Sequence, residues 1–186
     1  MSSSAKKKIK YKKKPRKDIF MKNILTRKII LPFQSVGSNI KENIIKILEE
    51  ESYNKCSKEG YIKNNSINIL SYSSGIVEEN HVVFDVSFEC EICHPVEGQL
   101  IKCQVQNITR AGIKAVYVKE KKSPIIVFIA RDHHYSNEGF NKLKENDNIT
   151  IKVIGIRYEL NDEFISVLGE LKQKIKPKSK VTIIDE

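Results

Sequence analysis

The chain has 186 residues, of which 40% are hydrophobic and 8% aromatic, with 8 glycines, 5 prolines and no tryptophan. This composition excludes collagen-like, wholly disordered and coiled-coil proteins, and it predicts a folded chain of two small domains or one medium one. The formal net charge is +10.

Three features predict a reducing compartment and no membrane-spanning segment. The longest uninterrupted apolar run, Ile125 to Ala130, has six residues, whereas a membrane-spanning helix needs about 20. The charged N-terminus lacks the apolar stretch of a signal peptide, so secretion is not expected. Four cysteines are too few for a secreted disulfide framework of this length.

The positive charge is concentrated at the N-terminus. Nine of the 33 basic residues lie in residues 1–17, which have no acidic residue, so residues 18–186 carry 24 basic side chains against 23 acidic ones. A segment with so much like charge and so few apolar groups is expected to be disordered. It is an import signal, a clamp on nucleic-acid phosphates or a solubilising tail, and the sequence alone leaves these three open.

One segment has a helical period. Apolar residues at 40, 44, 47 and 48 lie on one face, and Asn39 and Glu42 have the spacing of a capping box. The sequence therefore predicts a helix from Ile40 to Tyr53.

The rest of the chain favours strands. His81 to Cys93 alternates between apolar and polar residues, which is typical of a half-buried strand. Short stretches rich in β-branched and aromatic residues, bounded by turn residues, predict further strands at 24–31, 67–72, 99–107, 113–118, 125–130, 149–158 and 163–169. Residues 172–186 are expected to form a tail, in which Val181 to Ile184 either adds an edge strand or stays loose.

A break between two domains is predicted at residues 93–98. Pro95 cannot donate a hydrogen bond to a strand ladder, and Gly98 precedes a new alternating stretch. The first domain would have one helix on a small sheet. The second, with five strands between Gly98 and Leu171, has the size and strand number of an OB-fold barrel.

Several short motifs follow one another in the order of a known family. They are Gly60-Tyr61-Ile62, Gly75-Ile76-Val77, residues 83–88 and residues 95–99, followed in the second half by residues 98–105, 111–113, 126–129, 147–149 and 151–153. In this order the chain resembles the stalk subunit of multisubunit RNA polymerases, that is, the seventh subunit of RNA polymerase II and its archaeal and viral relatives. The resemblance covers about residues 18–171.

The resemblance implies an α+β fold at residues 18–96, a truncated RNP-like domain that docks on the polymerase core, with Gly60 and Gly75 at the docking tip. Residues 97–171 would be an all-β OB-fold of the ribosomal protein S-one type that binds RNA. The implied partners are the polymerase core subunits, a small helical stalk subunit and single-stranded nascent RNA. The implied location is the nucleus, or a cytoplasmic virus factory or virion, because the many Ile, Lys and Asn residues and the segment 131–134 resemble a large DNA virus version.

Five residues are candidates for RNA contact on the barrel: Lys114, Tyr117, Phe128, Arg131 and Arg157. OB folds stack bases on aromatic rings and follow phosphates with cations, and Tyr117 and Phe128 fall at or near the stacking positions of the S-one pattern. The alternative for both rings is an inward orientation in the barrel core. Lys114 stands where the family has an aromatic residue, and the alternative for it is an ordinary surface lysine.

Other chemistry has little support in the sequence. Cys90, Cys93, His94 and Cys103 have some of the residue types of a zinc site, but the cysteine pair ends a strand and no second close pair follows, so free buried thiols and no metal are expected. Arg131-Asp132-His133-His134 could serve a metal-dependent hydrolase, but neighbouring side chains on an extended segment point apart, and a polar loop is the simpler interpretation. No phosphate-binding glycine loop is present, and neither a cofactor nor catalysis is expected.

The alternative to a polymerase subunit is a free-standing OB-fold protein of translation or RNA decay.

Overall fold

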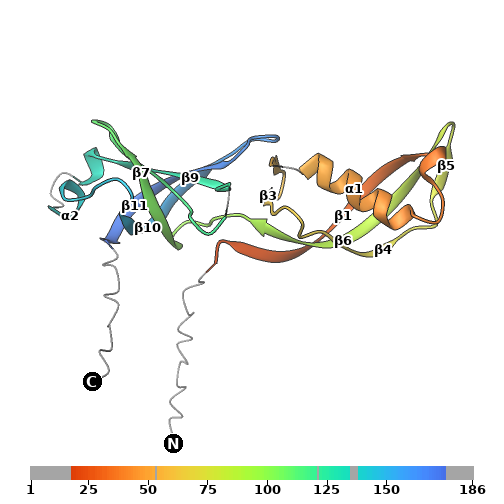
Figure 1. Ribbon diagram of the computed structural model, residues 1–186, viewed down its shortest axis with the longest axis horizontal. Coiled ribbons are helices and arrows are strands. Elements are labelled where there is room, and N and C mark those ends of the chain that lie inside the picture. The colour runs from red at the N-terminus through yellow and green to blue at the C-terminus, as the bar shows by residue number, and fades with distance from the viewer. Residues whose placement is uncertain (1–17, 53, 121, 135–137, 175–186) are drawn as a thin grey trace, which may run out of the picture.

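The computed structural model describes residues 18–52, 54–120, 122–134 and 138–174, and it is built mainly from strands in two separate sheets (Figure 1). The expected basic segment 1–17 lies outside the described residues. Among the described helices, none is long and apolar enough to cross a membrane.

Two long strands form the centre of the first sheet. β1 (Phe20–Pro32) and β6 (His81–Cys93) pair antiparallel over their whole length. The other side of β6 pairs with β5 (Ile76–Glu78), β4 (Asn68–Tyr72) and β3 (Gly60–Ile62), and β3 pairs with β2 (Cys56–Ser57). The predicted strand 81–93 is confirmed at both ends. The strands β2, β3 and β5 were not predicted, because two or three residues are too few to show a period.

One helix covers one face of this sheet. α1 (Ile40–Ser52) buries Ile44 and Leu48 against the sheet, after a short 3-10 turn η1 (Phe33–Ser35). The alternate residues of β6 that face the helix are all buried, and these are Val82, Phe84, Val86, Phe88, Cys90 and Ile92. The helix predicted from Ile40 is confirmed as far as Ser52, and Tyr53 lies outside the described residues. The kinship of this part to an RNP domain stays a prediction.

The second sheet is a closed barrel of five strands, which is compatible with an OB-fold. Its strands are β7 (Leu100–Ile108), β8 (Gly112–Val116), β9 (Ile125–Ala130), β10 (Asn148–Arg157) and β11 (Ile165–Lys174), arranged in the order β10-β11-β9-β8-β7. β9 and β11 are parallel, and the other neighbours are antiparallel. The 3-10 turn η2 (Asp132–His134) and the short helix α2 (Glu138–Asn141) lie between β9 and β10.

The last strand is longer than predicted. A strand was expected at 163–169 with the barrel ending at Leu171, but β11 continues to Lys174. Gln173 and Lys174 pair with Thr150 and Ile149 of β10, so the ladder holds these residues in the sheet although their sequence shows no alternation. The possible strand at residues 181–184 lies outside the described residues.

The two sheets meet at a closely packed joint. The chain leaves β6 at Cys93 and enters β7 at Leu100 through a turn in which Gly98 has φ of +81°. Four buried residues from the first part join the core of the barrel, namely Ile19, Cys56, Tyr61 and Cys93. Two backbone hydrogen bonds connect Cys56 to the β10–β11 turn, from its N–H to the Asp162 carbonyl (2.7 Å) and to its carbonyl from the Asn161 N–H (2.9 Å). The first part thus closes one end of the barrel (Figure 1).

Candidate nucleic-acid interface

Five residues from all five barrel strands form one row across the outside of the barrel. The strand register places Asn107 opposite Lys114, Lys114 opposite Phe128, Phe128 beside Leu168, and Leu168 opposite Gly155. Side chains alternate between the two faces of a strand, and the residues on either side of Phe128, Val127 and Ile129, are buried. The row, called here the Phe128 row, therefore lies on the outer surface.

The Phe128 row combines an aromatic ring with a cation and an aliphatic side chain. Phe128 is 41% exposed and Leu168 is 37% exposed. Lys114, which lies between Asn107 and Phe128 in the row, is also exposed. Lys114 has no ion-pair partner among the described residues. An exposed ring beside an uncompensated lysine can stack on a base while the lysine approaches the phosphate, and such contacts tolerate any sequence.

Gly112 leaves room for the ring of Phe128. A Cβ atom at Gly112 would lie 3.0 Å from Cζ of Phe128 and would also collide with the carbonyl oxygen of Ile129. The absent side chain lets the β8 backbone pass under the ring. Gly112 is therefore a positioning residue for Phe128.

Tyr117 does not belong to this surface. The ring is 3% exposed and packs in the barrel core, and its hydroxyl donates a hydrogen bond to Asp18 Oδ1 (2.9 Å). Burial and the hydrogen bond to Asp18 both raise the pKa of Tyr117. The ring thus has the inward orientation, which was the alternative to an RNA contact. Because the ring is buried, it has no free face on which a base could stack, and the prediction of base stacking on Tyr117 is wrong.

Arg131 and Arg157 lie on opposite sides of the row. Arg131 follows β9, and its guanidinium donates to the carbonyls of Arg110 (2.9 Å) and Thr109 (3.2 Å), so it holds the β7–β8 loop. Arg157, at the end of β10 toward the joint, contacts Glu159 (3.4 Å) and is largely exposed. The structure therefore brings Lys114 and Phe128 together and leaves the two arginines at the flanks.

Three relevant residues were missed from the sequence. Leu168 and Asn107 belong to the Phe128 row, and Asp18 is the acceptor for Tyr117. The alternation of Ile165, Val167 and Gly169 could have placed Leu168 outside, but no local signal joins Asp18 to a residue 99 positions later.

The two glycines expected at a docking tip lie at opposite ends of the first sheet. Gly60 is buried at the joint with φ of +127°, and a Cβ there would lie 2.5 Å from the Cys93 carbonyl oxygen. Gly75 precedes β5, which pairs with the beginning of β6 at Val83. Ten residues of β6 separate these positions, or about 30 Å. Figure 1 shows β3 beside the barrel and β5 at the far end of the molecule.

The far end of the first sheet has an apolar row. Ile30 of β1, Val83 of β6 and Ile76 of β5 are aligned by the strand register on the face opposite α1. Ile30 is 58% exposed and Ile76 63% exposed. This row, called here the Ile76 row, lies next to Gly75.

The cysteines are buried thiols, as expected. Cys56, Cys90, Cys93 and Cys103 are all free and buried. Burial raises the pKa of the Cys56 and Cys90 thiols to about 11 and that of the Cys93 and Cys103 thiols to about 12, so they stay protonated at neutral pH. Among the described residues, no group of three or more His, Cys, Asp or Glu side chains could hold a metal ion.

The histidines of the Arg131–His134 cluster point to different surroundings. His133 is exposed, whereas His134 is 4% exposed and stacks on Phe140 at 5.2 Å between ring centroids. Nε2 of His134 accepts the Leu171 N–H (2.9 Å), so Nδ1 carries the proton that is donated to the Ala130 carbonyl (2.8 Å). His134 therefore fastens η2 to β11 from the inside.

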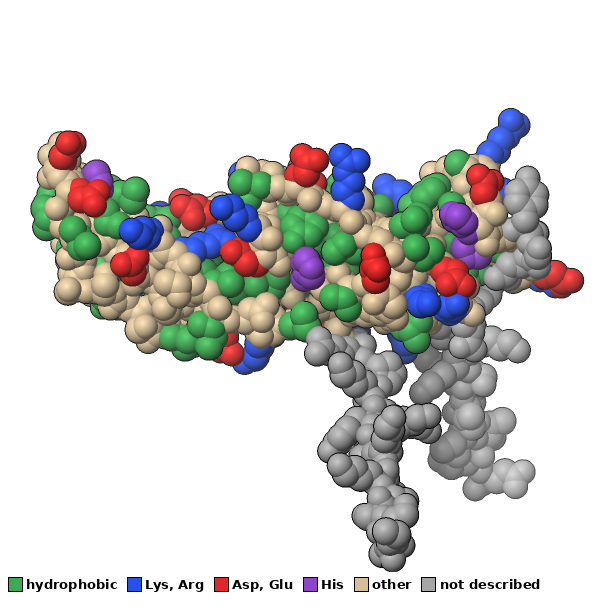
Figure 2. All heavy atoms as spheres, turned by 180° about the vertical axis from the view of Figure 1, so that it is seen from behind, with side chains coloured by type: hydrophobic (Ala, Val, Ile, Leu, Met, Phe, Trp, Pro, Cys, Tyr) green, Lys and Arg blue, Asp and Glu red, His purple; other side chains and the backbone are tan. Residues whose placement is uncertain are grey.

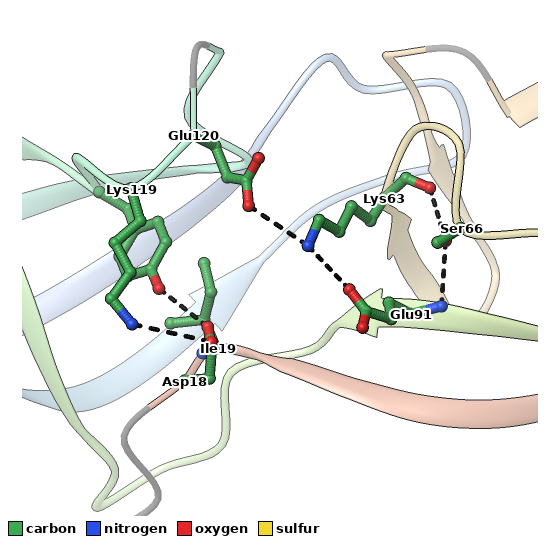
Figure 3. Close-up of polar contacts among 8 residues, drawn as sticks. Asp18, Ile19, Lys63, Ser66, Glu91, Lys119 and Glu120 are labelled. Carbon is green, nitrogen blue, oxygen red and sulfur yellow. Dashed lines mark hydrogen bonds and ion pairs between the residues drawn. The ribbon is translucent and has the colours of Figure 1, made fainter.

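Ion pairs link acidic and basic side chains in both parts of the molecule, for example Lys22 with Glu89 in the first sheet and Lys122 with Glu163 on the barrel. Figure 2 shows acidic and basic side chains interspersed over the visible face. At the joint, the Lys63 ammonium lies between Glu91 (2.8 Å) of β6 and Glu120 (3.6 Å) of the barrel (Figure 3). The hydrogen bond to Glu91 and the charge of Glu120 raise the pKa of Lys63. The body thus offers shape and a few local cations rather than a broad basic surface.

The fold and the Phe128 row define a class of protein: a helix-backed sheet joined to an OB-compatible barrel that has an exposed aromatic and cationic row. A search of family models finds no match. Among curated proteins, the chain is 27% identical over 158 residues to a protein of Acanthamoeba polyphaga mimivirus that is provisionally named as a DNA-directed RNA polymerase subunit, with 76% of each chain covered.

Two plant proteins match over a longer range. Subunit 7 of DNA-directed RNA polymerase II from Arabidopsis thaliana is 20% identical, and the subunit of the same number from Glycine max is 18% identical. Each match spans 82% of this chain and 98% of the relative. These matches agree with the resemblance expected from the sequence: the chain is similar to the seventh subunit of RNA polymerase II, and a viral protein is among the proteins that it matches.

Proposed function

We propose that this chain is a non-catalytic stalk subunit of a DNA-directed RNA polymerase and that its barrel contacts nascent RNA. The observation that carries the proposal is the match to two polymerase subunits over 98% of their length. A match of that extent includes both the first sheet and the barrel, whereas a free-standing OB protein would share the barrel alone.

The Phe128 row is the proposed RNA contact. Its ring, its uncompensated lysine and its aliphatic neighbour suit single-stranded RNA without sequence preference. A subunit held on a polymerase needs only weak contacts, because attachment keeps the barrel and the emerging transcript at high local concentration. A nearly neutral body is compatible with this role.

The far end of the first sheet is the proposed docking end. Two exposed isoleucines of the Ile76 row lie there beside Gly75, and apolar area removed from water stabilises such contacts by about 25 cal/mol per Å². Gly60 is buried at the joint, so we do not propose a docking role for it. The resemblance further implies core subunits and a small helical stalk subunit as partners, and a nuclear or viral location.

Affinity purification of the tagged full chain, followed by mass spectrometry, tests the polymerase assignment. The large polymerase subunits are expected to be recovered, whereas recovery with ribosomes or nucleases alone would contradict the assignment. The Ile76→Asp variant is expected to lose these subunits. Ile24→Asp is the matched control, because Ile24 is similarly exposed (67%) on the same sheet face but lies near its middle.

A further inference from the structure

We propose that RNA bound to the Phe128 row continues into a hollow at the end of the barrel away from the joint, where Arg110 contacts its phosphate. The hollow measures about 550 Å³ and is lined by Ile108, Thr109, Arg110 and Arg131. The inference rests on the proposed RNA contact of the barrel and deepens it, because it names the direction that the RNA takes from the row and the residue that holds its next phosphate.

The ring of Phe128 accounts for only part of an OB-fold site. One ring stacks one base, whereas OB folds bind about 4 to 16 nucleotides. Bound RNA must therefore extend beyond the Phe128 row. It can extend toward the hollow, which begins one residue after Asn107, toward the joint, or past Gly155 at the other end of the row.

The Phe128 ring leans toward the hollow. The Cα atom of Phe128 is paired with that of Lys114, but Cζ of the ring lies close to Gly112, two residues nearer the β7–β8 loop. Two residues of a strand correspond to about 7 Å. A base stacked on this ring thus lies over the part of β8 that leads into the loop, and one of its neighbours in the RNA is placed at the hollow.

The loop beside the hollow is held in place by hydrogen bonds. The N–H and the hydroxyl of Thr109 both donate to the Gly112 carbonyl, at 2.9 and 3.0 Å. The Arg131 guanidinium donates to the carbonyls of Thr109 and Arg110 and lies 5.4 Å from the ring centroid of Phe140. Figure 1 shows α2, which contains Phe140, at the same end of the barrel. The Arg110 side chain is exposed and forms no hydrogen bond with another described residue, so it can turn toward a phosphate.

The charges at the two ends of the barrel differ. The cations near the joint are paired with acidic side chains, namely Arg157 with Glu159 (3.4 Å), Lys122 with Glu163 (3.2 Å) and Lys119 with Asp18 (3.7 Å). Neither Arg110 nor Arg131 forms an ion pair with any acidic residue that the structure describes, Asp132 included. A phosphate is therefore attracted to the hollow, whereas it meets carboxylates at the joint.

The alternative continuation is the side of the barrel that carries Lys102 and Lys152. These lysines also have no ion pair among the described residues. Their strands, β7 and β10, contain no aromatic residue on which a further base could stack, and Lys152 lies beside Glu170 in the strand register. This side therefore suits RNA less well, and Lys152 provides a matched control for Arg110.

The test uses the full chain and four variants of it: Phe128→Ala, Arg110→Gln, Arg110→Lys and Lys152→Gln. Binding of a uridine oligomer of about 10 nucleotides, within the range of one OB-fold site, is measured by fluorescence anisotropy at several salt concentrations. Lys152→Gln is the control, because it removes an exposed cation without an ion pair from another side of the same barrel.

Arg110→Gln is expected to weaken binding about threefold at moderate salt and to lower the slope of log K against log salt by about 0.7, the value for one phosphate of a single strand. Arg110→Lys keeps the charge and is expected to keep the slope. Lys152→Gln is expected to leave affinity and slope unchanged. An unchanged slope for Arg110→Gln, or an equal loss for Lys152→Gln, would overturn the inference.

Amide chemical shifts of the isotope-labelled full chain locate the RNA independently of its affinity. On titration with the oligomer, the amides of residues 109–111 and of Phe128 are expected to shift together, and the shifts at 109–111 are expected to shrink in the Phe128→Ala variant. Inorganic phosphate at the same phosphate concentration is expected to shift residues 109–111 less. Equal or larger shifts would make the hollow a site for free anions and would overturn the inference.

Failure of the proposed RNA contact looks different. In that case the Phe128→Ala variant would bind the oligomer as tightly as the wild type, and the amide of Phe128 would not shift. If Phe128 responds to RNA but Arg110 does not, the inference about the hollow fails alone.

Discussion

The hydroxyl of Tyr117 on the barrel donates a 2.9 Å hydrogen bond to Asp18, which lies two residues before the first strand of the other sheet and 99 residues earlier in the chain. The bond joins the two parts of the molecule at the point where the basic segment ends. It also explains why this tyrosine, expected on the RNA surface, points inward.

Tyr117→Phe is expected to lower the free energy of unfolding by about 1 kcal/mol, because it removes one hydrogen bond to a charged acceptor but keeps the buried ring. Tyr117→Ala is expected to cost about 3 to 5 kcal/mol, since it also leaves a cavity. Urea denaturation followed by circular dichroism measures both. RNA affinity of the folded Tyr117→Phe variant should be that of the wild type, and a loss as large as that of Phe128→Ala would contradict the inward role.

Acid is expected to weaken the joint. Partial burial opposes ionisation of Asp18, but the hydrogen bonds from Tyr117 and Ile19 and the charge of Lys119 outweigh it and hold the pKa of Asp18 below its ordinary value. A carboxyl group with a lowered pKa in the folded state stabilises the protein above its unfolded-state pKa of about 3.9, and this contribution is lost as the pH falls through the folded-state value.

The stability difference between the wild type and Asp18→Asn should therefore be largest near neutral pH and shrink below pH of about 4. Urea midpoints measured at several pH values test this. Glu138→Gln is a control on an exposed ion pair with Lys142. If the stability difference between the wild type and Asp18→Asn stays constant down to about pH 2, the ionised carboxylate of Asp18 is not the source of that difference.

Phe128→Ala is expected to weaken binding of a short single-stranded RNA by about 5- to 150-fold, which corresponds to the loss of one stacked base at about 1 to 3 kcal/mol. Lys114→Gln is expected to reduce affinity less and to lower its salt dependence by roughly one phosphate contact. Fluorescence anisotropy measures both. Phe33→Ala is the matched control, because Phe33 is a similarly exposed aromatic residue (44%) in the first part of the molecule. If Phe33→Ala weakened RNA binding as much as Phe128→Ala, the assignment of the site would be contradicted.

His134→Phe is expected to lower the free energy of unfolding by about 1 to 3 kcal/mol, because the buried Leu171 N–H would lose its acceptor. His133→Ala on the exposed neighbour should change it by no more than about 0.5 kcal/mol. Thermal denaturation distinguishes the two. RNA binding by the folded His134→Phe variant should be unchanged, and a selective loss of binding without loss of stability would assign His134 to the site instead.

Much of the fold was predictable because burial imposes a period on the sequence. The alternation in His81–Cys93 and the apolar stripe of Ile40–Ser52 located the strand β6 and the main helix to within a residue, since each element packs one face against the same core. The strands β2 and β3 have no such signal. They exist because Tyr61 pairs with Cys93 at the joint, a contact between distant parts of the chain.

The candidate site was predictable only in part. The residues Lys114 and Phe128 followed from the motif order, but their position opposite each other depends on the register of β8 and β9. The burial of Tyr117 and the separation of Gly60 from Gly75 depend on how the first sheet closes the end of the barrel.

The sequence by itself predicted the main helix, most of the longer strands, a division near Pro95 to Gly98, the concentration of net charge in residues 1–17 and the family resemblance, because each depends on residues that are close together in the chain. Only the tertiary structure decided which rings face water and which residues share a surface. Those properties arise from strand register and from contacts such as Tyr117 with Asp18, and burial of a side chain depends on what the rest of the fold places against it.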